Sequence, residues 1–188
     1  MDKINVLRII MDHFSTLRDY RTGKLSVSDL GVFVGLPFLL GAAVWWWHFN
    51  FDANVLNGML AAFSIFAGLL LNLLVLVCLF AGNPRFVGAD AATATRRKLM
   101  LEIHENLSFS ILVAFAVAVL SLAGLCQIKY MKATDSHPLI SIPTTILLGN
   151  FILTLLMVLK RIHILLSTEF ERPSRLGPRC PISSVYTL

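Results

Sequence analysis

Residues 53–84, ANVLNGMLAAFSIFAGLLLNLLVLVCLFAGNP, contain no Lys, Arg, Asp or Glu. A helix needs about 20 mostly apolar residues to cross the roughly 30 Å hydrocarbon core of a bilayer, so this stretch is long enough to span a membrane. Three further stretches, 30–51, 106–128 and 136–159, also lack charged residues. The sequence therefore predicts an all-α membrane protein with four transmembrane helices.

The composition of the whole chain agrees with this pattern. Of 188 residues, 56% are hydrophobic and only 14% are charged, and the mean hydropathy is +0.75. All 16 basic and all 11 acidic residues lie outside the four uncharged stretches. These numbers exclude a single soluble core, a collagen-like rod and a disordered chain. We expect the spans at about 29–49, 54–82, 106–128 and 139–160.

The basic residues are distributed unevenly among the segments that connect the spans. Fourteen of the 16 lie before the first span, between the second and third spans, or after the fourth span. Lys129 and Lys132 are the two that lie between the third and fourth spans. Because positively charged segments stay on the cytoplasmic side, this distribution predicts that both termini are cytoplasmic. We expect a multi-pass protein of the bacterial inner membrane, with no cleavable targeting peptide.

Three regions follow from this topology. Residues 1–28 form a predicted cytoplasmic amphipathic helix, because apolar residues recur at helical spacing between positions 2 and 20. Residues 29–171 form the four-helix transmembrane domain, and residues 172–188 form an extended cytoplasmic arm with Pro173, Pro178 and Pro181.

Two of the predicted spans are expected to belong to longer helices. A helix that begins near residue 91 should enter the third span without a break. The fourth span, with Ser141 as its candidate N-cap, should continue past Lys160 as an amphipathic helix that ends before Pro173.

Small residues at helical spacing predict close contacts between the spans. Gly31 and Gly35 form a GxxxG motif in the first span, and Ser64 and Gly68 have the same spacing in the second. In the third span, Ala114, Ala118 and Ser121 lie on one stripe that suits tight packing. We interpret all of these positions as sites of helix packing.

Asn72 and Asn150 are the amides that lie away from the ends of the second and fourth spans. Each lies about nine residues from the predicted cytoplasmic end of its span, so we expect them at similar depth. The favoured interpretation is an interhelical hydrogen bond worth about 0.6 kcal/mol. The alternative is a polar constriction in a pore.

No Asp, Glu, Lys or Arg lies within the four uncharged stretches, which argues against a proton-coupled transporter or a voltage sensor. We find no hydrolase motif, phosphate-binding loop or metal-ligand spacing. We therefore predict no enzyme activity, no metal site and no cofactor. His104 and His163 lie at the predicted cytoplasmic boundary, and a haem or redox site built from them is the weakest alternative.

The cytoplasmic side carries basic residues that either contact lipid headgroups or bind a partner. They are Arg96, Arg97, Lys98, Arg172, Arg175 and Arg179. Lipid contact and topology are the favoured interpretation. However, the arm also carries apolar residues such as Tyr186, which favour docking into the groove or sheet edge of a soluble cytoplasmic protein. We further expect a homo-oligomer and no direct binding of nucleic acid.

A cytoplasmic amphipathic helix, four tight spans, minimal outer loops and a cytoplasmic tail resemble the small four-span membrane subunits of bacterial phage-defence systems, such as KwaA of Kiwa. The resemblance is one of layout over the whole chain, so no functional residue is carried over. It implies an oligomeric inner-membrane protein that works with a soluble effector. The first functional hypothesis is thus a membrane protein that docks a cytoplasmic partner and couples membrane state to it. The alternatives are a pore-forming or membrane-depolarising effector and a haem or redox subunit.

Overall fold

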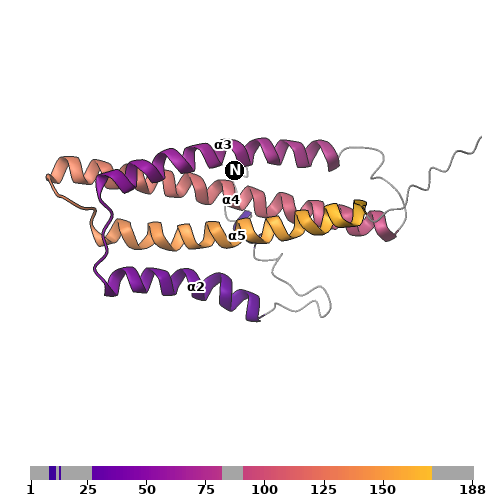
Figure 1. Ribbon diagram of the computed structural model, residues 1–188, viewed down its shortest axis with the longest axis horizontal. Helices are drawn as coiled ribbons and strands as arrows, with labels where there is room; N and C mark the ends of the chain where they lie inside the picture. The colour runs from indigo at the N-terminus through magenta and orange to yellow at the C-terminus, as the bar shows by residue number, and fades with distance from the viewer. Residues whose placement is uncertain (1–8, 12, 14–26, 82–90, 171–188) are drawn as a thin grey trace, which may run out of the picture.

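The computed structural model contains four long helices, α2 (Val27–Trp46), α3 (Ala53–Ala81), α4 (Ala91–Met131) and α5 (Pro138–Phe170) (Figure 1). It describes residues 9–11, 13, 27–81 and 91–170, without the side chains at 27–30, 81, 91–96 and 168–170. Residues 9–11 and 13 are also helical. The rest of the predicted amphipathic helix and the whole predicted arm lie outside the described residues.

Three of the helices are long and apolar enough to cross a membrane, over Ala53–Phe80, Arg97–Met131 and Pro138–Ser167. No strand occurs among the described residues, so the prediction of an all-α fold is confirmed, and the three long apolar helices are compatible with a membrane protein. α2 contains a shorter apolar segment, Gly31–Trp46. Whether α2 is a fourth span is taken up under the proposed function.

Two helices extend well beyond the length that a bilayer requires. α4 is a single helix of 41 residues, about 61 Å long at 1.5 Å per residue, and it confirms the unbroken helix predicted from residue 91. α5 has 33 residues and continues to Phe170, as the apolar stripe after Lys160 predicted. Both extensions lie at the same end of the molecule, where α4 begins and α5 ends (Figure 1). We call this end the charged end.

The opposite end, which we call the hairpin end, contains the short loops 47–52 and 132–137. The two loops are joined by an antiparallel bridge between Asp52 and Asp135, and the Ser136 amide donates to the Phe51 carbonyl at 2.9 Å. Phe51 and Ser136 are buried. The loop that follows α2 is therefore fixed to the loop that precedes α5.

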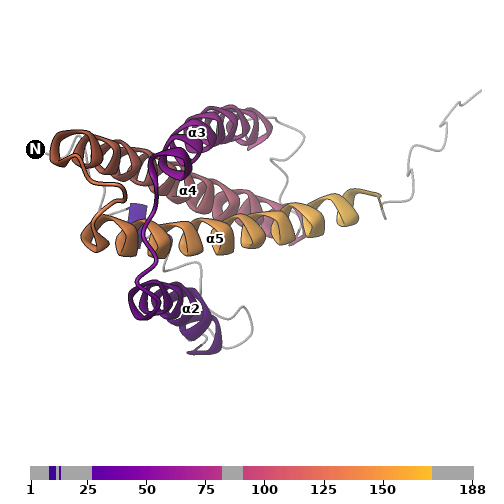
Figure 2. The ribbon, with the colours of Figure 1, turned by 60° about the vertical axis from the view of Figure 1, so that its left-hand side comes forward.

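This junction explains the order of the helices. Consecutive elements usually pack together, but α2 packs on α5 and makes no comparable contact with α3 or α4 among the described residues. The helices form one layer in the order α3, α4, α5 and α2 (Figures 1 and 2). Figure 2 shows that the layer is curved, with α2 at one edge and α3 at the other.

The core lies between α3, α4 and α5, and it combines apolar side chains with small hydroxyls. Phe63 of α3 and Phe151 of α5 meet with ring centroids 4.9 Å apart. Thr144 and Thr154 are fully buried, and each donates its hydroxyl hydrogen to the carbonyl four residues earlier on α5. Such short, internally bonded side chains allow helices to approach closely without leaving a polar group unsatisfied.

Small residues also set the spacing of the helices, and only some of them lie where the sequence predicted. Ala114 and Ser121 of α4 are fully buried, as expected from their stripe. Gly149 of α5 receives Pro37 of α2, because a Cβ at Gly149 would lie 3.3 Å from the Pro37 Cα. Gly124 of α4 receives Leu56 of α3 in the same way, at 2.9 Å from the Leu56 Cδ1.

The start of α5 differs from the sequence prediction. Ser141 was the expected N-cap, but the helix begins at Pro138, whose fixed φ and missing N–H suit the first helical position. The Ser141 hydroxyl instead hydrogen-bonds the Ser136 hydroxyl at 2.8 Å and so holds the preceding loop.

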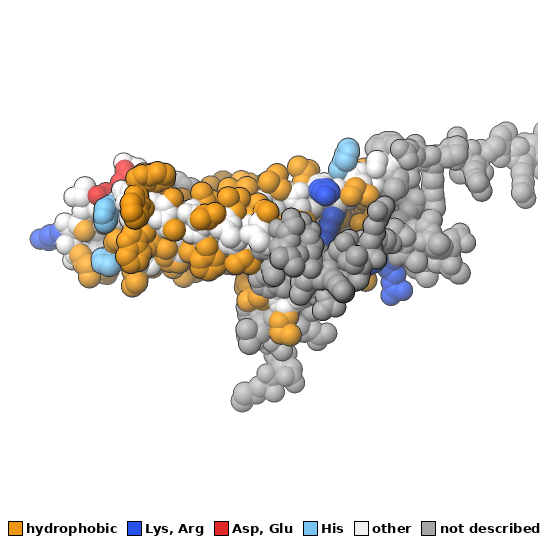
Figure 3. Space-filling view, turned by 90° about the horizontal axis from the view of Figure 1, so that it is seen from below, with side chains coloured by type: hydrophobic (Ala, Val, Ile, Leu, Met, Phe, Trp, Pro, Cys, Tyr) orange, Lys and Arg blue, Asp and Glu red, His pale blue; other side chains and the backbone are white. Residues whose placement is uncertain are grey.

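The outer surface reflects the same division of the chain. Hydrophobic side chains cover the long middle part of the face shown in Figure 3, while acidic, basic and His side chains gather toward the two ends. Exposed large apolar residues are numerous along α2, α3, α4 and α5. This distribution suits a protein whose middle lies in hydrocarbon.

Candidate functional site at the charged end

His13 is the centre of a polar cluster at the charged end. It is 1% exposed and its ring stacks on Phe109 of α4, with centroids 3.9 Å apart and planes 5° apart. Phe33 of α2 meets the same ring edge-on at 6.1 Å. A segment that precedes all four helices is thus inserted between the first of them and the third.

Asn106 holds His13 in this position. The His13 Nδ1–H donates to the Asn106 Oδ1 at 2.7 Å. The Asn106 Nδ2 in turn donates to the Glu102 carbonyl at 2.6 Å, one turn earlier on α4. Because both ends of the amide are bonded, its orientation is fixed, and Asn106 itself is fully buried.

Arg161 of α5 joins the same group of residues. Its guanidinium lies 3.5 Å from the Glu102 carboxylate and also donates to the Glu102 carbonyl at 3.2 Å. These side chains are only 12% and 24% exposed, and charge-assisted bonds of this kind are about twice as strong as neutral ones. Glu102 therefore connects α4 to α5 directly and to His13 through Asn106.

The surroundings of His13 disfavour its charged form. Burial lowers the pKa of His13 to about 4, the hydrogen bond to Asn106 opposes this shift, and the nearby Arg161 cation adds to it. The His13 ring is therefore neutral at physiological pH. A neutral ring can stack on Phe109 without an ionic desolvation cost.

The cluster joins parts of the chain that do not otherwise meet. It links the N-terminal segment, α2, α4 and α5 at one level, with Phe33, Phe109, Asn106 and Arg161 on three different helices. Ile9 and Ile10 extend the contact, because they pack against the hydrophobic core. A change in the position of α2 relative to α5 would therefore be felt by the N-terminal segment.

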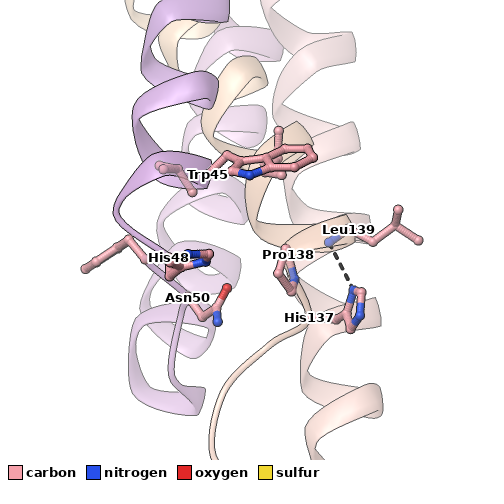
Figure 4. A pocket seen from close by; sticks show the side chains of 9 residues that line it. Trp45, His48, Asn50, His137, Pro138 and Leu139 are labelled. Atoms are coloured by element: carbon pink, nitrogen blue, oxygen red, sulfur yellow. Dashed lines mark hydrogen bonds between the residues drawn. The ribbon is translucent and has the colours of Figure 1, made fainter.

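A cavity lies at the hairpin end between α2 and α5 (Figure 4). It has a volume of about 360 Å³ and is lined mostly by apolar groups, with Trp45 on one side and Leu139 on the other. His137 does not point freely into it, because its Nδ1 accepts the Leu139 N–H at 3.2 Å. The cavity offers few polar groups and no cluster of potential catalytic residues.

The two intramembrane amides are not brought together. Asn72 is exposed on α3, whereas Asn150 is half-buried on α5. Phe151, the neighbour of Asn150, contacts Phe63 and Phe66, which precede Asn72 by six residues or more, or about 9 Å along the helix. Both helices begin at the hairpin end, and Asn72 lies 19 residues after the start of α3 whereas Asn150 lies 12 residues after the start of α5, so the two amides are not at the expected similar depth.

The glycines chosen from the sequence are not those that contact another helix. A Cβ at Gly31, Gly35 or Gly68 would meet no described atom within 4 Å. Ser64 is exposed, and its hydroxyl donates to the Leu60 carbonyl of its own helix at 2.7 Å. Among the described residues, these four positions do not serve the helix packing that was predicted for them.

The basic residues are described only in part. Arg97 and Lys98 are exposed on α4 at the charged end, as a contact with lipid or with a partner requires. Arg96 lies in the same helix, but its side chain is outside the described set. The remaining members, Arg172, Arg175, Arg179 and Tyr186, lie outside the described residues.

The boundary histidines differ in their exposure. His104 is half-buried on α4 and His163 is exposed on α5. Within the described part of the chain, no three His, Cys, Asp or Glu side chains are placed to hold a metal ion. The haem or redox alternative therefore gains no support from the geometry of these residues.

The sequence interpretation missed the cluster residues for identifiable reasons. His13 lies three and four residues after Ile10 and Ile9, so the three side chains share one side of a helix, and this spacing is the signal that could have marked it as buried. Asn106 is the first residue of an uncharged stretch and was treated as a boundary. Glu102 and Arg161 are opposite charges at matching levels of antiparallel helices, a pairing visible only once those helices are adjacent.

Comparison with known proteins identifies no relative. No family model, no curated protein and no solved structure matches the chain. The fold and the cluster at the charged end are therefore the basis for a functional proposal.

Proposed function

We propose that the chain is a four-span protein of the bacterial inner membrane that docks a soluble cytoplasmic protein at its charged end and couples membrane state to that partner. Its biological setting, on the basis of layout alone, is antiphage defence. The observation that carries the proposal is the insertion of His13 between Phe33 of α2 and Phe109 of α4.

The topology is supported by length and charge. α2 has 20 residues, which span about 30 Å, the thickness of the hydrocarbon core. With α2 as the first of four spans, the chain crosses the membrane an even number of times. The excess of Lys and Arg at the charged end favours a cytoplasmic location for this end and for both termini.

A docking function is supported by the shape of the charged end. α4 and α5 project past the membrane together, and the bonds between Arg161 and Glu102 keep them paired. Such a rigid pair presents Arg97 and Lys98 at a fixed position. An acidic surface on a soluble protein would be complementary to these groups and to the basic arm.

Coupling is supported by the weak attachment of α2. This helix packs on α5 alone among the described helices, so it is the element that can move with the least loss of contact. Phe33 connects it to His13. A change in the membrane that tilts α2 against α5 would loosen the N-terminal segment and thereby alter the docking surface.

Affinity purification in a mild detergent tests the docking. We expect a cytoplasmic protein to copurify in stoichiometric amount, and we expect Arg97→Glu with Lys98→Glu, or deletion of 173–188, to lose it. Lys129→Glu with Lys132→Glu is the matched control, because it reverses the same charges at the hairpin end and should retain the partner. A clean homomer that none of these changes affects would overturn the proposal.

The topology is tested separately by reporter fusions. A fluorescent protein fused after residue 188 should fold and fluoresce, whereas alkaline phosphatase inserted at residue 134 should be active because it is exported. Activity of the phosphatase at the C-terminus would show that the chain has the opposite orientation or three spans.

A further inference from the structure

The outer face of α3 carries a regular stripe of exposed residues. Measured around the helix at 100° per residue, eleven positions of α3, Asn72 included, lie within about 60° of Asn72, and eight of them follow one another in alternating steps of four and three. They are Asn54, Gly58, Ala61, Ile65, Gly68, Asn72, Val75 and Leu79, and all are exposed. A sustained alternation of this kind is the heptad repeat of helices that wind around one another.

No part of the described chain covers this stripe. α3 lies at one edge of the layer and packs on α4 with its opposite face, where Leu56, Phe63 and Leu70 are buried. A Cβ added at Gly58 or at Gly68 would meet no described atom within 4 Å. The glycines therefore leave a shallow path along α3 that a second helix can approach closely.

Asn72 distinguishes this face from a surface that only contacts lipid. It lies within the uncharged stretch 53–84 and is exposed, and no described residue hydrogen-bonds its side chain. An amide without a partner in hydrocarbon costs several kcal/mol. A lipid tail offers no donor or acceptor, so the side chain requires a polar partner at the same depth.

We propose that the stripe binds a second copy of the chain, with two parallel α3 helices and with the two Asn72 amides hydrogen-bonded across the two-fold axis. A second copy inserts in the same orientation, so it places an identical amide at an identical depth. An amide carries both a donor and an acceptor, so two of them are mutually complementary. The dimer interface is isologous, as expected for a two-fold dimer.

The heptad positions agree with this assignment. If Asn72 occupies position a, then Gly58, Ile65 and Leu79 also occupy a, and the other stripe residues occupy d. A single Asn at an a position fixes register and oligomeric state in parallel coiled coils. In a membrane it has the same effect, because a shift of register would separate the two amides.

Disulfide cross-linking in membranes maps this interface. In a background in which Cys78, Cys126 and Cys180 are replaced by Ser, we expect Gly68→Cys and Val75→Cys to form disulfide-linked dimers on mild oxidation. Leu71→Cys is the matched control on α3, because Leu71 is also exposed but lies about 100° from Asn72. Restoring only Cys78, which is exposed about 120° from Asn72, provides a second control.

Two substitutions test the energetics in proteoliposomes. Asn72→Leu should raise the dimer dissociation constant by about tenfold, and Asn72→Gln should recover part of that loss. Gly68→Leu should abolish the dimer by steric overlap, whereas Gly31→Leu, the same change at another open glycine, should leave it intact. At both positions a Cβ would meet no described atom of its own chain within 4 Å.

The outcomes are decisive in each direction. Cross-links at Gly68→Cys and Val75→Cys but not at Leu71→Cys support the interface. Equal cross-linking at all positions, no cross-linking, or a dimer unaffected by Gly68→Leu overturns it. The inference rests on the membrane placement of α3, which is part of the proposed function, and resistance of the protein to extraction with alkaline carbonate tests that placement independently. A chain that stays in the membrane without cross-linking refutes the dimer alone.

Discussion

The two ends of the bundle are held by different kinds of contact. At the hairpin end, the bonds are short, neutral and close to the loops, such as those from Phe51 to Ser136 and from Ser136 to Ser141. At the charged end, His13 bonds Asn106 across a separation of 93 residues, beside the ion pair of Glu102 with Arg161. The hairpin end therefore suits a fixed anchor, whereas the charged end depends on groups that titrate and can be released.

The largest effect is expected from filling the packing contact near the hairpin end. In Gly124→Leu the new side chain would start 2.9 Å from the Leu56 Cδ1, and Leu56 has no exposed surface into which it could move. We expect a loss of about 3 kcal/mol or more in the free energy of unfolding, measured as the thermal midpoint in detergent. Gly31→Leu is the control and should change the midpoint little. Equal midpoints would show that α3 and α4 do not depend on this contact.

The next largest effect is the pH dependence of the docking of the segment that contains His13. Burial lowers the pKa of His13 to about 4, below its unfolded value of 6.5, so the released segment binds more protons than the docked one between these values. Docking is therefore fully stable above pH 6.5 and weakens as the pH falls toward 4, by roughly 2 to 3 kcal/mol in total. The charged groups nearby are Arg161 on α5 and Glu102 and Glu105 on α4.

A thiol probe measures this release. Met11→Cys, at an exposed position two residues from His13, should react with a maleimide faster at pH 5 than expected from the pH dependence of an unfolded control peptide. His13→Gln should remove the extra pH dependence, whereas His163→Gln, at an exposed His of the same end, should retain it. If His13→Gln keeps the full dependence, His13 is not the group whose protonation releases the segment.

A smaller effect is expected from the amide that orients His13. Asn106→Leu preserves the approximate volume but removes the bonds to His13 and to the Glu102 carbonyl, at a cost of about 1 to 2 kcal/mol. Hydrogen exchange at residues 9–13 should become roughly tenfold faster, while exchange at the hairpin end should not change. Ser108→Ala is the control, because that hydroxyl bonds only the His104 carbonyl of its own helix. Similar acceleration in both variants would remove the special role of Asn106.

The sequence predicted the helices better than it predicted their neighbours. Uncharged runs and helical periodicity located α3, α4 and α5 to within a few residues, because hydrophobic length is a local property. The packing of α2 on α5 could not be read in this way, since it depends on the bridge between Asp52 and Asp135 in two distant loops. The same holds for the glycines, because Gly124 and Gly149 matter only through the residues opposite them.

The candidate site shows the same limit more strongly. The basic character of the charged end was evident from composition, but the cluster of His13, Asn106 and Arg161 arises from three distant segments. Each residue alone has an ordinary explanation as a polar position near a membrane boundary. Their chemistry follows from mutual proximity and burial, which spacing along the chain does not encode.

The smallest effect concerns backbone strain at the hairpin end. Lys132 directly follows α4 and has a φ of 50°, in the left-handed region. The next residue, Ala133, donates its amide to the Ile128 carbonyl. Helices that end in this way usually have glycine at the left-handed position. We expect Lys132→Gly to raise the free energy of unfolding by about 0.5 kcal/mol, because glycine adopts this conformation without a Cβ clash. Lys129→Gly, in the last turn of the helix, should lower it by roughly 0.5 to 1 kcal/mol. Both changes remove one positive charge from the same helix end, so the difference between their thermal midpoints isolates the backbone. If both variants lose stability equally, the positive charge rather than the backbone governs this helix end.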